Sequence, residues 1–152
     1  MADRLNEEQR RHLMSRVRGQ NTKPELQVRS AAHAMGLRFR LHRRDLPGKP
    51  DLVFPKWRIA IFVHGCFWHR HFGCHKASLP TTRSEFWATK LARNVERDAE
   101  NTDRLKALGW SVGVIWECES RKPDQLRAHL TSIFTYEPAE PGCGPRSASP
   151  AR

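Results

Sequence analysis

Long apolar runs are missing from this sequence. The longest is Ile59–Val63, far short of the roughly 20 apolar residues that cross a bilayer. The first residues, Met1–Asn6, are polar, so we expect a cytoplasmic protein with neither a signal peptide nor a membrane span. Acidic residues are also scarce: 16 Asp and Glu stand against 27 Lys and Arg, for a formal net charge of +11 at pH 7. This imbalance disfavours basic partners and favours a polyanion.

The sequence is also poor in cysteine and tyrosine. Four cysteines in 152 residues are too few for a disulfide-stapled miniprotein. Without an export signal we expect them to stay reduced, which favours thiolate ligands over disulfides. Against a single Tyr there are five Trp. Aromatic side chains in a basic chain of one-domain length indicate contacts with bases and phosphates.

Local signals divide the chain into three parts. They are a helical arm over residues 1–19, one domain over residues 20–136 and a disordered, proline-rich tail over residues 137–152. In the arm, Asn6 resembles the N-cap of a helix that would end near Gly19.

The domain alternates helical and strand patterns, which predicts an α/β fold. Thr22-Lys23-Pro24-Glu25 forms a capping box in which Glu25 reaches back, and it predicts a helix from about Lys23 to Met35. Apolar residues at 37, 39 and 41 alternate with basic ones, as in a half-buried strand with a basic outer face. The other expected elements are a strand hairpin over residues 51–54 and 59–63, a helix over 84–108 with a break near Asn94, a further central strand over 110–116 and a last helix over 123–134.

Residues 64–82 form a long segment without a sustained period, so something besides an apolar core must hold it. We expect zinc to hold it, with four ligands: Cys66, His71, Cys74 and Cys118. Three sulfurs and one imidazole make a closed tetrahedral set of the kind that holds structural zinc. His75 is an alternative to His71 in this set, and Cys143 in the tail is expected to be unrelated.

A carboxylate at the start of a strand is a candidate catalytic group. Asp51 follows Pro50 and precedes a strand and the His-rich segment, where a metal-dependent nuclease keeps a magnesium ligand, although Asp is also a common turn residue. His64 and His69 fall outside the zinc spacing, so either is a candidate base for a water that attacks phosphate. The capping box already accounts for Glu25.

Two pairs of adjacent aromatics, Phe67-Trp68 and Phe86-Trp87, stand in basic surroundings. Adjacent residues of a regular element cannot both face one core. The pairs therefore either plug the top of a core or act as wedges that unstack bases.

Several short motifs follow one another in this sequence: Leu46–Asp51, Phe62–His71, Thr82–Trp87, Asn94–Asp98 and Trp116–Cys118. Taken in order, they resemble those of the very short patch repair (Vsr) DNA mismatch endonucleases, over about residues 8–134. The resemblance implies a restriction-endonuclease-like (PD-(D/E)xK-type) fold, with a central mixed sheet flanked by helices and a structural zinc. It implies a magnesium-dependent nick 5′ of the thymine in T:G mismatches that arise from deamination of 5-methylcytosine.

The resemblance also assigns roles by position. Asp51 matches the magnesium carboxylate and His69 the general base, with His64 and Glu25 in support. Val63 stands where a Thr can occur, so its metal contact would use the backbone carbonyl. The Asp/Glu-x-Lys half of the wider nuclease pattern is absent, and histidines replace its lysine. Cys66, His71, Cys74 and Cys118 match the zinc ligands, with one extra residue before Cys74 that keeps His75 open as the alternative.

DNA contacts and partners follow from the same resemblance. Phe67, Trp68 and Trp87 match intercalating aromatics, Lys90 and Asn94 match residues that face the mismatch, and Met14 lies on an arm that reaches the minor groove. The implied partners are duplex DNA with a T:G mismatch, a cytosine-5 DNA methyltransferase and mismatch-repair proteins, and we expect a monomer that acts at the bacterial nucleoid. Two alternatives remain: a zinc-stabilised module that binds distorted duplex without cutting it, and a restriction-like nuclease that acts on other DNA.

Overall fold

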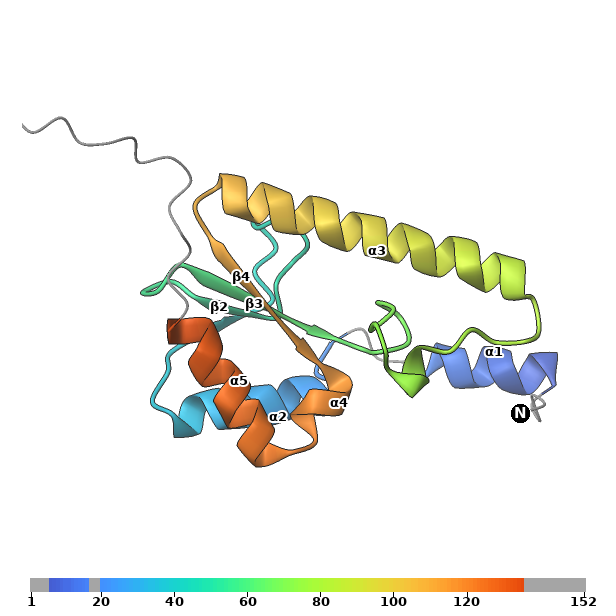
Figure 1. Cartoon of the computed structure of the whole chain (residues 1–152), viewed down its shortest axis with the longest axis horizontal. Coiled ribbons are helices and arrows are strands. Elements are labelled where there is room, and N and C mark those ends of the chain that lie inside the picture. The colour runs from blue at the N-terminus through green and yellow to red at the C-terminus, as the bar shows by residue number, and fades with distance from the viewer. Residues whose placement is uncertain (1–5, 17–19, 136–152) are drawn as a thin grey trace, which may run out of the picture.

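A mixed sheet lies at the centre of the protein, between two layers of helices (Figure 1). The computed structural model describes residues 6–16 and 20–135. Within that part the strand order is β1-β2-β3-β4, and β4 is parallel to β3 whereas the other pairs are antiparallel. The predicted α/β architecture, a mixed sheet flanked by helices, is therefore confirmed. The strands are β1 (Arg40–Leu41), β2 (Leu52–Phe54), β3 (Ile59–His64) and β4 (Ser111–Trp116).

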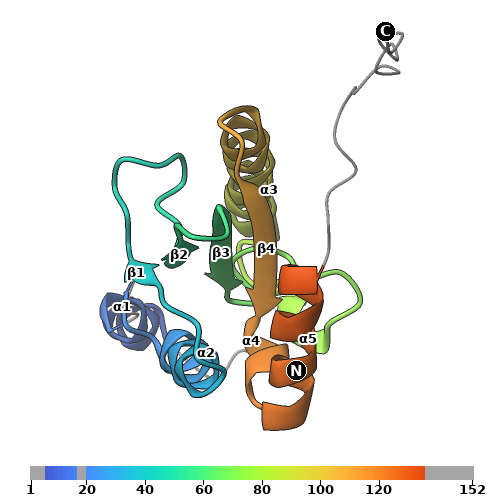
Figure 2. The ribbon, with the colours of Figure 1, turned by 90° about the vertical axis from the view of Figure 1, so that its left-hand side faces the viewer.

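The parallel pairing of β3 and β4 requires a crossover, which runs through the long helix α3 (Ser84–Ala107) on one face of the sheet. The helices α2 (Lys23–Ala34), α4 (Glu117–Ser120) and α5 (Pro123–Thr135) cover the other face (Figure 2). Helix α1 (Glu7–Ser15) extends away from the sheet beside the start of α3, and a short 3-10 turn, η1 (His75–Ala77), interrupts the segment before α3 (Figure 1).

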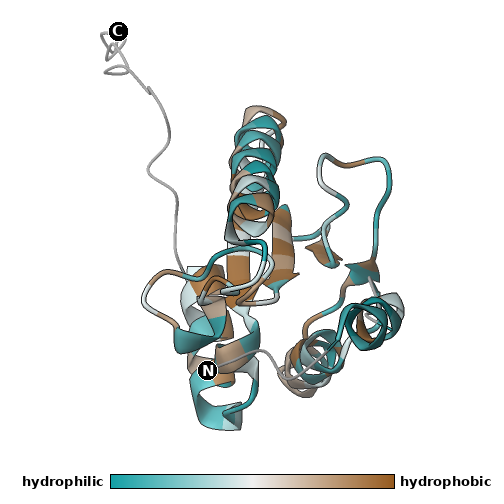
Figure 3. Cartoon of the chain, turned by 90° about the vertical axis from the view of Figure 1, so that its right-hand side faces the viewer, coloured by the Kyte–Doolittle hydropathy of each residue, from teal (hydrophilic) through white to brown (hydrophobic). Residues whose placement is uncertain are grey.

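Alternate residues of the strands build two cores, one on each face of the sheet. Figure 3 shows the apolar strands beneath the largely hydrophilic helix α3. Burial on both faces explains why β2 and β3 read as nearly continuous apolar runs. The core under α3 contains Leu46, Val53, Ala60, Phe62 and Leu105, and the core under α2 and α5 contains Val28, Ala32, Leu52, Phe54, Ile59, Ile61, Ile115, Leu126 and Leu130.

Capping signals predicted the helix starts correctly. Asn6 and Gln9 form a reciprocal capping box on α1, and the Thr22 side chain accepts from the Glu25 N–H at 3.4 Å at the start of α2. Helix α5 begins at Pro123 as predicted. The arm helix ends earlier than predicted, at Ser15 with Arg16 as its C-cap, and not near Gly19. The proline-rich tail lies outside the described residues. No helix in the described ranges is long and apolar enough to span a membrane.

Two strand predictions are corrected. The predicted strand over 37–41 shortens to β1, because only Arg40 and Leu41 pair with β2, and Leu41 is 42% exposed. The strand predicted as central, β4, lies at one end of the order among the described strands. Helix α5 packs closely onto it: a Cβ on Gly113 would lie 2.9 Å from Ile133 Cδ1.

The predicted break near Asn94 is wrong, because α3 is continuous from Ser84 to Ala107. An Asn in a helix interior favours a break when its side chain competes for local backbone groups. Here the Asn94 side chain donates instead to the Trp68 carbonyl at 3.1 Å and accepts from Arg97 at 2.8 Å. The helix can therefore continue through this position.

Candidate functional site

The register of the β2–β3 hairpin brings Asp51 to the end of β3. Leu52 pairs with Ile61, so in the same register Asp51, the residue before β2, falls opposite Phe62 and next to Val63. The Val63 N–H donates to Asp51 Oδ2 at 2.7 Å, which fixes the orientation of the carboxylate. The predicted candidates from the turn and from the end of β3 therefore meet at one edge of the sheet.

Helix α2 supplies a second carboxylate through Glu25, which is only 3% exposed. Its Oε2 accepts from the Asn21 N–H at 2.9 Å and from Arg29 at 3.1 Å, and it lies 3.5 Å from His42 Nε2. The predicted capping box is corrected in this respect, because Glu25 reaches back to Asn21, not to the cap residue Thr22. Glu25, His42 and Asp51 offer ligand atoms within 4.8 Å of one another.

These groups line one cavity of about 850 Å³. Its walls come from the start of α2, the turn before β2, the end of β3, the segment after β3 and the middle of α3. The cavity brings together all five predicted residues of the catalytic and magnesium sets: Glu25, Asp51, Val63, His64 and His69.

Burial is the main cause that raises the pKa of Asp51 to about 6, and the charge of nearby Glu25 raises it further. The Val63 N–H, His69 and Arg29 act in the opposite direction without cancelling this effect. The buried carboxylate of Glu25 and the half-buried carboxylate of Asp51 therefore form a site that a hard divalent cation would stabilise.

A pair of stacked imidazoles lies beside the carboxylates. The rings of His64 and His69 have centroids 3.8 Å apart and planes inclined by 6°. Burial, and then the neighbouring His69, lower the pKa of His64 to about 4, so His64 is neutral at ordinary pH. The backbone N–H of His69 donates to the Gly65 carbonyl at 3.2 Å, which ties its position to the end of β3.

His69 has a carboxylate partner that sequence reasoning missed: Asp98 Oδ2 lies 2.5 Å from His69 Nδ1. A carboxylate at Nδ1 holds the proton there and leaves Nε2 as the basic nitrogen. The signal that could have found Asp98 is the helical period of α3. Between buried Leu91 and Leu105 the same face carries polar residues, namely Asn94, Asp98, Asn101 and Thr102.

The four expected zinc ligands also come together. Cys66, His71, Cys74 and Cys118 offer ligand atoms within 4.8 Å of one another, and His71 Nδ1 lies 3.6 Å from Cys66 Sγ and 3.4 Å from Cys118 Sγ. His75 is exposed in η1 and is not one of the four, so the geometry favours His71. Its ring stacks on Trp116 at 4.2 Å, a contact that the sequence did not predict.

The donor chemistry of this cluster fits zinc. Burial, together with the neighbouring Cys118 and Cys74 thiols, raises the pKa of Cys66 to about 12. Such a thiol ionises only beside a strong positive charge, and three thiolates with one imidazole are a typical structural set for Zn²⁺.

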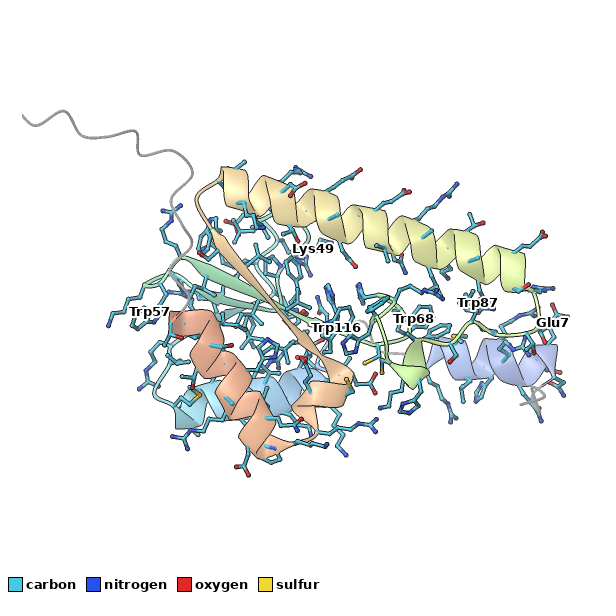
Figure 4. The ribbon with its side chains drawn as sticks, in the orientation of Figure 1. Glu7, Lys49, Trp57, Trp68, Trp87 and Trp116 are labelled. Carbon is cyan, nitrogen blue, oxygen red and sulfur yellow. The ribbon has the colours of Figure 1, made fainter. Side chains whose placement is uncertain are left out.

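Aromatic side chains form a cluster next to the cavity, under the first half of α3 (Figure 4). Phe67, Trp68 and Trp87 have ring centroids 5.1 to 5.9 Å apart, and Lys90 lies over both Trp rings at 5.6 and 5.5 Å. Trp87 is only 7% exposed, whereas its neighbour Phe86 is 55% exposed. Trp87 thus has the burial of a core residue, and Trp68, which lines the cavity, is better placed to meet a ligand.

The arm carries the last predicted contact, Met14, which is half-buried on α1. Arg83, just before α3, pairs with Glu7 of α1 at 2.8 Å. This exposed ion pair links the arm to the end of α3 that carries the aromatic cluster.

Comparison with known proteins identifies one family and several relatives. Residues 2–76 match the family described as DNA mismatch endonuclease Vsr. The chain is 51% identical to the type II nicking enzyme V.XorIIP of Xanthomonas oryzae over 134 residues, 88% of this chain and 98% of that protein. It is 41% identical to the DNA mismatch endonuclease Vsr of Escherichia coli over 126 residues, 83% of this chain and 80% of that protein. It is 35% identical to the type II nicking enzyme V.NmeAIP of Neisseria meningitidis over 133 residues, 88% and 94% of the two chains.

Proposed function

The chain belongs to the Vsr family of DNA mismatch endonucleases, and from that premise we propose that it nicks duplex DNA 5′ of the thymine in T:G mismatches left by deamination of 5-methylcytosine. The observation that carries the proposal is the meeting of Asp51 with the His69–Asp98 pair in one cavity, beside an aromatic cluster. Relatives named as nicking enzymes support a cut in one strand.

We propose that Asp51 and the backbone carbonyl of Val63 hold a magnesium ion. Oxygen ligands suit this cation, and the raised pKa of Asp51 marks a position where added positive charge is favourable. When bound, Mg²⁺ neutralises charge on the scissile phosphate and lowers the pKa of the attacking water. The carboxylate of Glu25, held by Arg29 and the Asn21 N–H, supports this site from α2.

His69 is the proposed general base. Its Nε2 takes a proton from the attacking water, while Asp98 holds the Nδ1 proton and stabilises the imidazolium that forms. Neutral His64, stacked on His69, is a positioning residue that keeps the ring plane fixed without adding a competing positive charge.

Replacing His69 by Ala is expected to slow nicking by about 10²- to 10⁴-fold and to leave binding of T:G duplex unchanged, because a general base acts only in the chemical step. The measurement is the single-turnover rate with magnesium, alongside duplex affinity. His33→Ala, on the exposed side of α2, is the matched control and should behave like the parent. A parent protein that binds the duplex tightly and never cuts it would instead support the non-catalytic binding module.

We propose that zinc on Cys66, His71, Cys74 and Cys118 is structural and that the fold is restriction-endonuclease-like. Four protein ligands complete a tetrahedral shell, so no position is left for a reacting water. The order of the strands, with Asp51 ahead of β2 and the crossover helix before a parallel β4, supports the fold assignment.

Phe67 and Trp68 are the proposed wedges at the mismatch, and Lys90 and Asn94 face the same region from α3. Trp87 is buried against Phe67 and Trp68, so it supports these two wedge side chains from inside the protein. Met14 on α1 is the proposed contact in the minor groove.

Trp68→Ala is expected to keep its zinc and its fold but to lose about 1 to 3 kcal/mol of affinity for T:G duplex, the usual value of one base stacked on an aromatic ring. Trp87→Ala should lower the melting temperature as well, because its ring is buried. Trp57→Ala, in the exposed turn between β2 and β3, is the control for affinity. If Trp68→Ala lowered only the melting temperature, Trp68 would be a core residue.

We also propose that the protein acts as a monomer in the bacterial cytoplasm, at the nucleoid, together with a cytosine-5 DNA methyltransferase and mismatch-repair proteins. A T:G lesion is asymmetric, so it gives no reason for the two-fold symmetric dimer that paired half-sites require.

A further inference from the structure

The charges of the cavity pose a problem for an anionic substrate. Its lining residues include four carboxyl groups, those of Glu25, Asp51, Asp98 and Glu117. A phosphodiester that entered would meet repulsion from several sides. Lys49 is the one lysine or arginine among the described residues that line this cavity.

Lys49 is held in an uncommon backbone conformation. Gly48 and Lys49 both have positive φ, 74° and 50°, and the Lys49 N–H donates to the Leu46 carbonyl at 3.2 Å. At residue 48 the turn touches α3, because a Cβ there would lie 3.0 Å from the Asn101 side chain. Lys in the left-handed region carries a cost that Gly or Asn would largely avoid, so its presence calls for a reason in the side chain.

The ammonium group of Lys49 is available to a ligand. Among the described residues it forms no ion pair, although four carboxyl groups line the same cavity. Lys49 is exposed and lies between α3 and the strands (Figure 4). Pro50 follows it and Asp51 comes next, so the same turn carries the lysine and the proposed metal ligand.

We propose that Lys49 binds a non-bridging oxygen of the scissile phosphate and adds a positive charge to a cavity that four carboxyl groups line. The inference rests on the proposed nuclease function and adds a substrate-binding residue to it. A lysine placed there stabilises the charge that builds up on the phosphate as water attacks. The contact of Gly48 with Asn101 keeps the backbone of this turn close to α3 and to the cavity.

Three variants of Lys49 separate the effect of its side-chain charge from the effect of its strained backbone conformation. Lys49→Gln removes the charge and keeps the strained backbone, Lys49→Gly removes the charge and relieves the strain, and Lys49→Arg keeps the charge. The control Lys56→Gln removes a lysine from the exposed turn at the far end of the same hairpin. For each protein we would measure the single-turnover nicking rate at saturating enzyme with magnesium, the melting temperature and the salt dependence of duplex affinity.

The Gln and Gly variants are expected to nick about 10²-fold more slowly, as when one preorganised donor to a developing anion is removed. Their plots of log affinity against log salt should be shallower by about 0.9, the loss of one phosphate contact. Lys49→Arg should stay within about tenfold of the parent, and Lys56→Gln should match the parent rate. Lys49→Gly should melt no lower than Lys49→Gln, because Gly tolerates the positive φ.

If the Gln and Gly variants both kept the parental nicking rate and salt slope, Lys49 would be an exposed turn residue with no role in substrate binding, and the proposal would be overturned. Recovery of the rate in Lys49→Gly alone, which would indicate a backbone role, or a loss in Lys49→Arg as large as in Lys49→Gln would also overturn it. A failure of this proposal can be told apart from a failure of the proposed function. If the parent prefers another duplex to T:G, the same variants are assayed on that duplex, and the salt slope does not require cleavage at all.

Discussion

Asp51→Asn is expected to bind T:G duplex as tightly as the parent, to nick it at least about 10³-fold more slowly, and to melt at a higher temperature. The loss of rate follows because Asn removes the charged ligand of the proposed magnesium, whose contribution to such reactions amounts to several kcal/mol. The affinity is expected to come from the basic side chains and the proposed stacking rings, which the substitution leaves in place.

The rise in melting temperature follows from the pKa of Asp51. Its native value of about 6 lies above the ordinary 3.8, so the folded protein disfavours the ionised form. Above a pH of about 6 the parent carries the full stability cost of this charge, and the cost shrinks as the pH falls from about 6 toward 3.8, below which both the folded and the unfolded chain are protonated. Asn carries no charge at any pH and can still accept the Val63 N–H, so the fold should gain stability while the reaction is lost.

Melting curves and single-turnover rates on the same preparations test both parts of this expectation. Asp103→Asn, on the exposed side of α3, removes a carboxylate elsewhere and should change neither quantity. Added magnesium should raise the melting temperature of the parent more than that of Asp51→Asn. A variant that nicked at the parental rate would show that Asp51 is not the catalytic carboxylate.

Cys118→Ala is expected to lose bound zinc and to yield little soluble, folded protein. Cys118 sits in α4, far along the chain from Cys66, His71 and Cys74, so it ties the long segment after β3 to the end of β4. Without the metal, the ordering entropy of that segment has no compensation, and metal binding in such sites is coupled to folding.

Zinc content per chain and soluble yield measure this effect. Cys66→Ala should behave like Cys118→Ala, whereas Cys143→Ala, in the tail, should keep one zinc per chain and full activity. A folded, zinc-free Cys118→Ala protein with parental activity would contradict a structural zinc site.

Local sequence signals were enough for the starts of α1, α2 and α5, and they singled out four side chains that the structure brings together, Cys66, His71, Cys74 and Cys118. A cap such as Asn6 or Thr22 acts on its own neighbours, and three cysteines with a histidine indicate zinc by donor type alone. The hairpin that carries Asp51 was also predictable, because a short turn connects two adjacent strands.

The groups that orient the site could not be predicted in the same way. Asp98 meets His69 across 29 residues of sequence, and His42 reaches Glu25 only because the chain turns back before β2. Tertiary contacts of this kind leave at most a weak pattern in the sequence, such as the row of polar residues on one face of α3. The same holds for Asn94, whose bond to Trp68 removed the reason for a helix break.

The most direct test of the proposed function is to map the nick on duplexes that differ in one base pair. T:G and C:G duplexes of identical flanking sequence, each labelled on one strand at a time, are incubated with the protein and magnesium, and the products are separated on a denaturing gel. We expect one cut, immediately 5′ of the mismatched thymine, with the opposite strand and the C:G duplex intact. Equal cutting of both duplexes, cuts in both strands, or tight binding of T:G duplex without any cut would contradict it.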